Sequence, residues 1–149
     1  MAEWSGVNLP EGSVVTTRKP RFFFLMSGVK ALPIPFTSDS DEFLDRLRAG
    51  GSRYVSLDLL DDMSGYYVYP ALLEHLGTFC GLVDAGSGGE SGTQLLGLKE
   101  GADEEDFESE VAQNLTRCPE EMFREVPREE GRVGGWDIPL LVREAGIPK

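Results

Sequence analysis

Strand and helix patterns alternate through the first hundred residues of the chain, and this alternation restricts the folds that it can adopt. Residues 14–17 are β-branched throughout, which predicts a strand buried on both faces. Pro20 suits the first turn of a following helix, and Gly28 suits its exit. Residues 30–36 predict a second strand, which two prolines either confine to an edge of the sheet or cause to end early.

The same alternation continues beyond the second strand. Polar and acidic residues at 37–42 mark the start of a helix, with Ser38, Asp39 or Ser40 as its cap, and a Gly-Gly pair at 50–51 ends it. Further elements are expected as follows: a short helix before Pro10, a strand at 53–60, a helix at 69–76 and short strands at 79–83 and 93–98. This order predicts an α/β fold, a small three-layer, Rossmann-like, mostly parallel sheet with an antiparallel strand at one edge.

The last third of the chain differs from the rest in charge. Residues 1–99 hold 12 acidic and 8 basic side chains, and residues 100–149 hold 14 and 6, so the second segment carries −8 of the net charge of −12. We therefore expect an α/β domain at 1–99 and an acidic, partner-binding extension at 100–149. Apolar side chains of the extension are the expected partner contacts: Phe107, Phe123, Trp136, Ile138, Leu140 and Leu141. They could pack on the chain's own core or on another protein.

The negative charge argues against nucleic-acid binding, because the phosphate backbone repels such a surface. Anionic lipid headgroups are repelled as well, unless a basic patch is segregated on one face. The basic cluster of the sequence is Arg18-Lys19 together with Arg21. Contacts with protein subunits are therefore the expected kind of partnership.

Location and redox state follow from short segments. The longest apolar run, 22–26, is far shorter than the roughly 20 residues of a membrane-spanning helix, so no transmembrane segment is expected. Because the first residues lack a basic and an apolar signal region, we expect a cytoplasmic protein, peripheral to the membrane. Cys80 and Cys118 are too few for a disulfide framework and lack metal-binding spacing, so both are expected to be reduced.

Several short segments resemble a known family: 2–4 (Ala-Glu-Trp), 9–12 (Leu-Pro-Glu-Gly), 14–15, 18–20 (Arg-Lys-Pro), 27–28, 35–36 and 54–55 with Asp58. Over residues 2–98 the sequence resembles the soluble C-terminal domain of bacterial polytopic membrane glycosyltransferases, of the lipid-linked-sugar type related to protein mannosyltransferases. In that family the acidic residues that handle the donor lie in the membrane portion, which this sequence lacks. The resemblance implies an accessory α/β layer without catalytic residues. It also implies an extracytoplasmic location if the chain is a fragment of such an enzyme.

The basic cluster is the first candidate site. Arg18, Lys19 and Arg21 follow a strand and open a helix, where open α/β sheets bind ligands and helix N-termini attract anions. No glycine lets a ligand approach the backbone there, as a dinucleotide site requires. Anion binding therefore stands beside a second interpretation, a salt bridge or a partner contact.

Other residues are weaker candidates for a metal-binding or catalytic site. Asp58, Asp61 and Asp62 follow a strand and could bind Mg²⁺, but aspartates also begin loops for turn reasons alone. His75 is the single histidine, and no serine or cysteine has the sequence frame of a hydrolase nucleophile. Cys80 is expected to be a small buried apolar residue. We therefore expect no catalytic residue, no metal and no cofactor.

The three consecutive phenylalanines at 22–24 cannot all face one sheet, because neighbouring helix positions differ by about 100°. One of them is expected to face outward. An exposed Phe beside an exposed Tyr, as at 66, 67 or 69, would mark a contact surface.

Three hypotheses for function remain. The first is a non-catalytic, extrinsic scaffold subunit that binds and stabilises a multi-subunit membrane complex, of which a photosynthetic reaction-centre and antenna assembly is one class. The second is a soluble accessory domain of a lipid-linked-sugar glycosyltransferase, which the resemblance implies. The third is an anion- or nucleotide-binding enzyme that acts through Arg18, Lys19 and Asp58.

Overall fold

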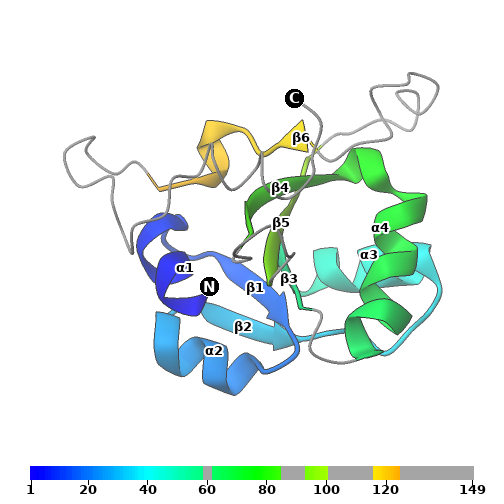
Figure 1. Cartoon of the computed structure of the whole chain (residues 1–149), viewed down its shortest axis with the longest axis horizontal. Helices are drawn as coiled ribbons and strands as arrows, with labels where there is room; N and C mark the ends of the chain where they lie inside the picture. The colour runs from blue at the N-terminus through cyan, green and yellow to red at the C-terminus, as the bar shows by residue number, and fades with distance from the viewer. Residues whose placement is uncertain (59–61, 85–92, 101–115, 125–149) are drawn as a thin grey trace.

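The computed structural model describes residues 1–58, 62–84, 93–100 and 116–124, which form an α/β domain around one mixed sheet (Figure 1). Its strands are β1 (Val14–Thr17), β2 (Lys30–Pro33), β3 (Tyr54–Leu57), β4 (Phe79–Asp84), β5 (Gln94–Leu98) and β6 (Thr116–Arg117). Its helices are α1 (Ala2–Asn8), α2 (Pro20–Ser27), α3 (Ser40–Ala49) and α4 (Tyr69–Glu74), with the π-helical turn η1 (Ser64–Val68) and the 3-10 turns η2 (Leu76–Thr78) and η5 (Glu120–Met122).

The strand order in the sheet is β2-β1-β3-β5-β4-β6. β1 pairs in parallel with β2 and β3, and β4 pairs in parallel with β6, whereas β5 runs antiparallel to both β3 and β4. The predicted α/β class and the mostly parallel sheet are confirmed. The antiparallel strand was expected at an edge, but it lies inside the sheet. β5 lies between β3 and β4 because it pairs with β4 as the second strand of an antiparallel hairpin and with β3 on its other side.

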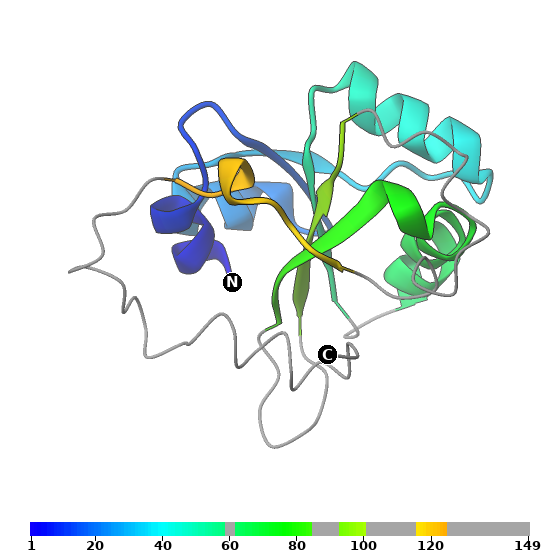
Figure 2. The ribbon, with the colours of Figure 1, turned by 90° about the horizontal axis from the view of Figure 1, so that it is seen from above.

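Helices cover both faces of the sheet and give it two cores (Figure 2). α1 and α2 lie on one face, where Trp4 and Phe23 pack against Val15 and Tyr54 of the strands. On the other face, α3 and α4 pack against alternate strand residues such as Val55. Since successive strand residues point to opposite faces, both Tyr54 and Val55 are buried in one strand.

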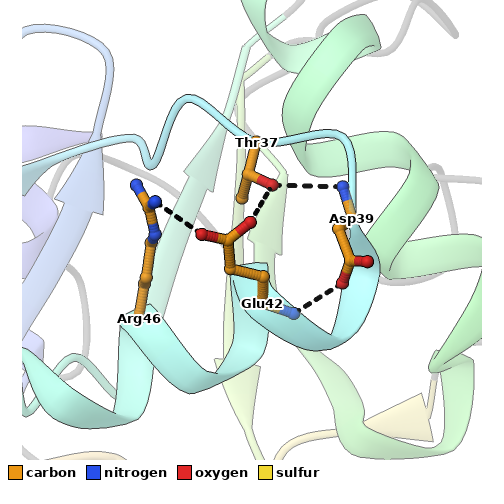
Figure 3. A network of polar contacts seen from close by, with 4 residues as sticks. All are labelled: Thr37, Asp39, Glu42 and Arg46. Atoms are coloured by element: carbon orange, nitrogen blue, oxygen red, sulfur yellow. Dashed lines mark hydrogen bonds and ion pairs between the residues drawn. The ribbon is translucent and has the colours of Figure 1, made fainter.

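The start of α3 is held by a local polar network (Figure 3). Asp39 caps the helix, since its Oδ1 accepts the backbone N–H of Glu42 at 2.8 Å. The Glu42 carboxylate accepts the Thr37 hydroxyl at 2.7 Å and the Arg46 guanidinium at 2.5 Å. These charge-assisted bonds lower the pKa of Glu42, with the Thr37 bond as the largest cause and the Arg46 bond and charge next. Of the three predicted caps, the structure uses Asp39.

The close contact between α1 and α2 depends on Gly6. A Cβ at this position would collide with the backbone carbonyl oxygen of Ser27. Gly28 ends α2 with φ of 70°, the left-handed conformation that the sequence predicted for this exit. The two glycines together fix how α2 lies beside α1.

Two further sequence-based expectations are wrong. Cys80 and Cys118, expected as reduced thiols, form a disulfide. A helix was expected to begin at residue 69, but it is preceded by the π-helical turn η1, which begins at Ser64. Residues 116–124 lie beyond the boundary predicted near residue 99, and they add β6 to the sheet and bury Met122 in the core with Trp4. The disulfide and the packing of residues 116–124 depend on contacts between distant segments, which local patterns do not encode.

Candidate functional site

The carboxyl ends of β1 and β3 form the position where open α/β sheets most often bind ligands. These parallel strands are neighbours, but the chain leaves β1 toward β2 on one side and leaves β3 toward β4 on the other. Arg18 follows β1 and Asp58 follows β3, and Nε of the arginine lies 3.0 Å from Oδ2 of the aspartate. Only 18% and 12% of the two side chains are exposed.

This ion pair changes what the predicted basic cluster can do. The Arg18 guanidinium donates to Asp58, so its charge is balanced within the protein. The backbone N–H of Asp58 in turn donates to Ser64 Oγ at 3.3 Å. Lys19 and Arg21 stand exposed beside the pair at the start of α2. The salt-bridge interpretation of Arg18 is therefore the one that the geometry supports, and anion binding at Lys19 and Arg21 stays a prediction.

The acidic residues after β3 are not gathered in the described structure. Asp58 is engaged with Arg18, Asp62 is exposed, and Asp61 lies outside the described residues. Within the described ranges, no three His, Cys, Asp or Glu side chains form a group that could hold a metal ion.

His75 lies between two helices. Its Nε2 is 3.0 Å from Oδ1 of Asp41, which places the end of α4 beside the first turn of α3, but the two atoms do not make a hydrogen bond. Cys80, the nearest cysteine in sequence, is bonded to Cys118 and has no free thiol. The described histidine therefore has a carboxylate neighbour and a structural position between helices.

Two exposed aromatic side chains, Phe36 and Tyr66, and the half-buried Tyr67 form an aromatic surface. Phe36 and Tyr67 meet edge to face with ring centroids 5.5 Å apart, and Tyr66 follows at 6.4 Å from Tyr67. Phe36 and Tyr66 are each 67% exposed. The tyrosines were singled out in the sequence, whereas Phe36 was missed because it was assigned to the second strand, which in the structure ends at Pro33.

A second exposed apolar surface covers α2. Phe23 points into the core, while the exposed fractions of Phe22, Phe24, Leu25 and Met26 are 60%, 56%, 79% and 42%. The sequence predicted that one phenylalanine would face outward, and the structure has two in that position. We call Phe22, Leu25 and Met26 the α2 outer face, since positions i, i+3 and i+4 share one side of a helix.

An open groove of about 500 Å³ lies between α1, the turn after it and the end of α2. Gly6, Phe24, Lys30 and Arg124 are among its lining residues. The backbone N–H of Arg124 donates to the carbonyl of Asn8 at 2.6 Å, which brings the last described residue to α1.

The predicted partner contacts of the extension fall mostly outside the described residues. Phe107, Trp136, Ile138, Leu140 and Leu141 all lie there. Phe123 is described, and it packs edge to face on Trp4 with ring centroids 6.2 Å apart. The Arg117 guanidinium lies over the same ring, 6.0 Å from its centroid. Phe123 is thus partly used within the chain itself.

No known family model matches this sequence, and no curated protein or solved structure shows significant similarity to it. Among the described helices, none has the length and apolar character needed to cross a bilayer.

Proposed function

We propose that this protein is a non-catalytic, extrinsic subunit that binds and stabilises a multi-subunit membrane complex. One observation carries the proposal: a small α/β domain presents two separate exposed apolar surfaces, the aromatic surface and the α2 outer face. A subunit that connects other components needs at least two contact surfaces. Exposed apolar patches of this kind are typical of interaction sites.

The two surfaces belong to opposite sides of the sheet. The buried side of α2 contributes Phe23 to the core beneath α1 and α2. Tyr67 of the aromatic surface packs against the other core, beneath α3 and α4. Because the sheet separates them, two different neighbours could contact the domain at the same time.

The aromatic surface has the composition of a protein contact. Tyrosine and phenylalanine are enriched at the centres of protein interfaces. Ring contacts already hold Phe36 against Tyr67, so little side-chain freedom would be lost when a partner binds. We assign this surface to a protein subunit of the complex.

The disulfide bears on location. Disulfides persist in oxidising compartments and are rare in the reducing cytosol. The bond between Cys80 and Cys118 therefore supports the extracytoplasmic side of the membrane over the cytoplasmic side expected from the sequence. A photosynthetic reaction-centre and antenna assembly remains one class of complex to which such a subunit could belong.

The same disulfide favours a second candidate function, an accessory domain of a lipid-linked-sugar glycosyltransferase. The resemblance to that family implies an extracytoplasmic domain, and an oxidised cysteine pair fits such a location. We also propose that the sheet is of the Rossmann-like type that the sequence predicts. The acidic extension, with Trp136 and its apolar neighbours, would bind partners in either case.

Co-purification from solubilised native membranes tests the first function. The tagged full chain should retain a defined set of membrane subunits, and the double variant Phe36→Ser/Tyr66→Ser should lose them. Leu73→Ser is the comparison variant, because Leu73 on α4 is exposed to 69% and is not among the residues that define either surface. Equal recovery of subunits with the double variant would contradict the proposal. A thermal shift specific to polyprenyl-phosphate sugars, without co-purifying subunits, would favour the second function.

A further inference from the structure

Helix α2 has more apolar surface than its packing uses. All eight of its residues are described, and Phe23 is the one that is buried. The α2 outer face, Phe22, Leu25 and Met26, points away from the sheet. A helix that is apolar on all sides is normally covered on all sides, so this one lacks a covering partner in the described structure.

The exposed area is large for one short helix. Phenylalanine has roughly 150–250 Å² of surface to bury, so the exposed fractions on α2 correspond to about 400 Å² of apolar area. Apolar patches of that size on small proteins are often functional sites. Figure 1 shows α2 at the periphery of the molecule, where a flat surface could reach it.

The charges around α2 differ in sign from those of the whole chain. Residues 1–34 carry four basic side chains and two acidic ones, Glu3 and Glu11; since Asp58 balances Arg18, the remaining charge is +1 in a chain of −12. Of these basic residues, Lys19 and Arg21 are exposed at the start of α2. Lys30 is exposed two residues after Gly28. The segregated basic patch that anionic lipid binding requires is therefore present beside the apolar face.

The arrangement of this surface, more than its composition, favours lipid. Phe, Met and Arg are also frequent at protein interfaces, but an apolar helix face with Lys and Arg beside it is typical of helices that lie in a membrane interface. The α2 outer face contains Phe, Leu and Met, which have no polar group to be satisfied within the acyl region. Exposed cations at the start of the helix would meet the headgroup phosphates.

We propose that α2 docks this protein on a bilayer with anionic headgroups, with Phe22, Leu25 and Met26 inserted at the headgroup boundary and Lys19 and Arg21 against the phosphates. This inference rests on the proposed function only for the presence of a membrane near the complex. It gives the two apolar surfaces different partners, lipid for α2 and a protein subunit for the aromatic surface.

Vesicle flotation with the purified full chain tests this inference without any partner subunit. We expect binding to phosphatidylcholine vesicles that contain phosphatidylglycerol, and weaker binding at high salt or without the anionic lipid. Phe22→Ser/Leu25→Ser should reduce binding at least about tenfold, because each side chain contributes apolar burial equivalent to a decade or more in affinity. Lys19→Glu/Arg21→Glu should abolish the preference for anionic lipid. Leu73→Ser is the matched control and should bind as the wild type does.

A fluorescent reporter locates the contact. Phe22→Trp should gain emission that is quenched by brominated lipid, whereas Leu73→Trp should not. Unfolding curves for each variant separate loss of docking from loss of fold. The inference is overturned if the wild-type chain ignores anionic vesicles or if Phe22→Ser/Leu25→Ser still binds them. If that variant instead loses co-purifying subunits, α2 is a protein contact, and the proposed function survives without membrane docking.

Discussion

Cys80 of β4 and Cys118, directly after β6, form a disulfide with Cα atoms 4.9 Å apart. Strand β6 pairs with β4 at two positions, Cys80 with Thr116 and Gly81 with Arg117. A two-residue strand gives few backbone hydrogen bonds. The disulfide therefore fastens the edge of the sheet where pairing alone is weakest.

Removal of the disulfide should destabilise the protein. The cross-link closes a loop with a sequence separation of 38, for which chain entropy gives about 4 kcal/mol of stabilisation. We expect Cys80→Ala/Cys118→Ala to lower the free energy of unfolding by up to that amount in urea titrations. Reductant should shift the wild type toward the variant and leave the variant unchanged. Identical midpoints for wild type and variant would contradict the assignment.

Gly97→Ala should be costly because the sheet leaves no space for a methyl group at this point of β5. A Cβ there would lie 2.6 Å from Cε of Met122, 2.8 Å from Sγ of Cys118 and 3.0 Å from Sγ of Cys80. Overpacking of this kind costs about 2 kcal/mol, measurable by thermal unfolding. Gly77→Ala is the control, since a Cβ there meets no atom within 4 Å. The loss of stability caused by Gly97→Ala should be smaller in the Cys80→Ala/Cys118→Ala variant, because the two sulfur atoms are absent there. An equal loss in that variant would show that the added methyl group does not collide with the sulfur atoms.

Truncation should separate residues 116–124 from the remainder of the extension. A chain of residues 1–124 should fold, because it keeps fully buried Met122 and the hydrogen bond from Tyr54 Oη to the Met122 carbonyl at 2.8 Å. A chain ending at 99 should be far less stable. Met122→Ala alone should cost about 3 kcal/mol, while exposed Glu121→Ala should change stability by less than about 0.5 kcal/mol. The midpoint of urea unfolding should be measured for the two truncated chains and the two point variants. Equal stability of the two truncated chains would show that residues 116–124 do not contribute to the fold.

Acid should weaken the start of α3. The pKa of Glu42 is lowered in the folded state from its ordinary 4.5, so its contribution is present above that value and is lost as pH falls through the lower, folded pKa. We expect Glu42→Gln to be less stable than the wild type at neutral pH and the difference to vanish in acid. Thr37→Val should reproduce part of this effect, because the Thr37 bond is the largest cause of the shift. Parallel stability curves from neutral to acidic pH would refute the role of Glu42.

Local rules predicted the elements well where a helix or strand is limited by its own residues. Pro20 and Gly28 bound α2 because proline fits a first turn and glycine adopts the left-handed exit. The candidate site was predicted only in part, since the sequence placed Arg18 and Asp58 at strand ends but left their partners open. Their pairing follows from β1 and β3 being neighbours in the sheet, which no local pattern states.

The sequence by itself determined the α/β class, the strands β1 to β5, the helices α1 to α4 and the outward position of a phenylalanine on α2, because these depend on local backbone preference and on the period of apolar residues. Only the tertiary structure decided which strands are neighbours, that Cys80 meets Cys118, and that Phe22 and Phe24 both stay exposed. These features depend on contacts between segments distant in the chain. The physical reason is that side-chain burial and strand pairing depend on how the whole molecule packs, whereas helix and strand propensity depends on the residues of each segment.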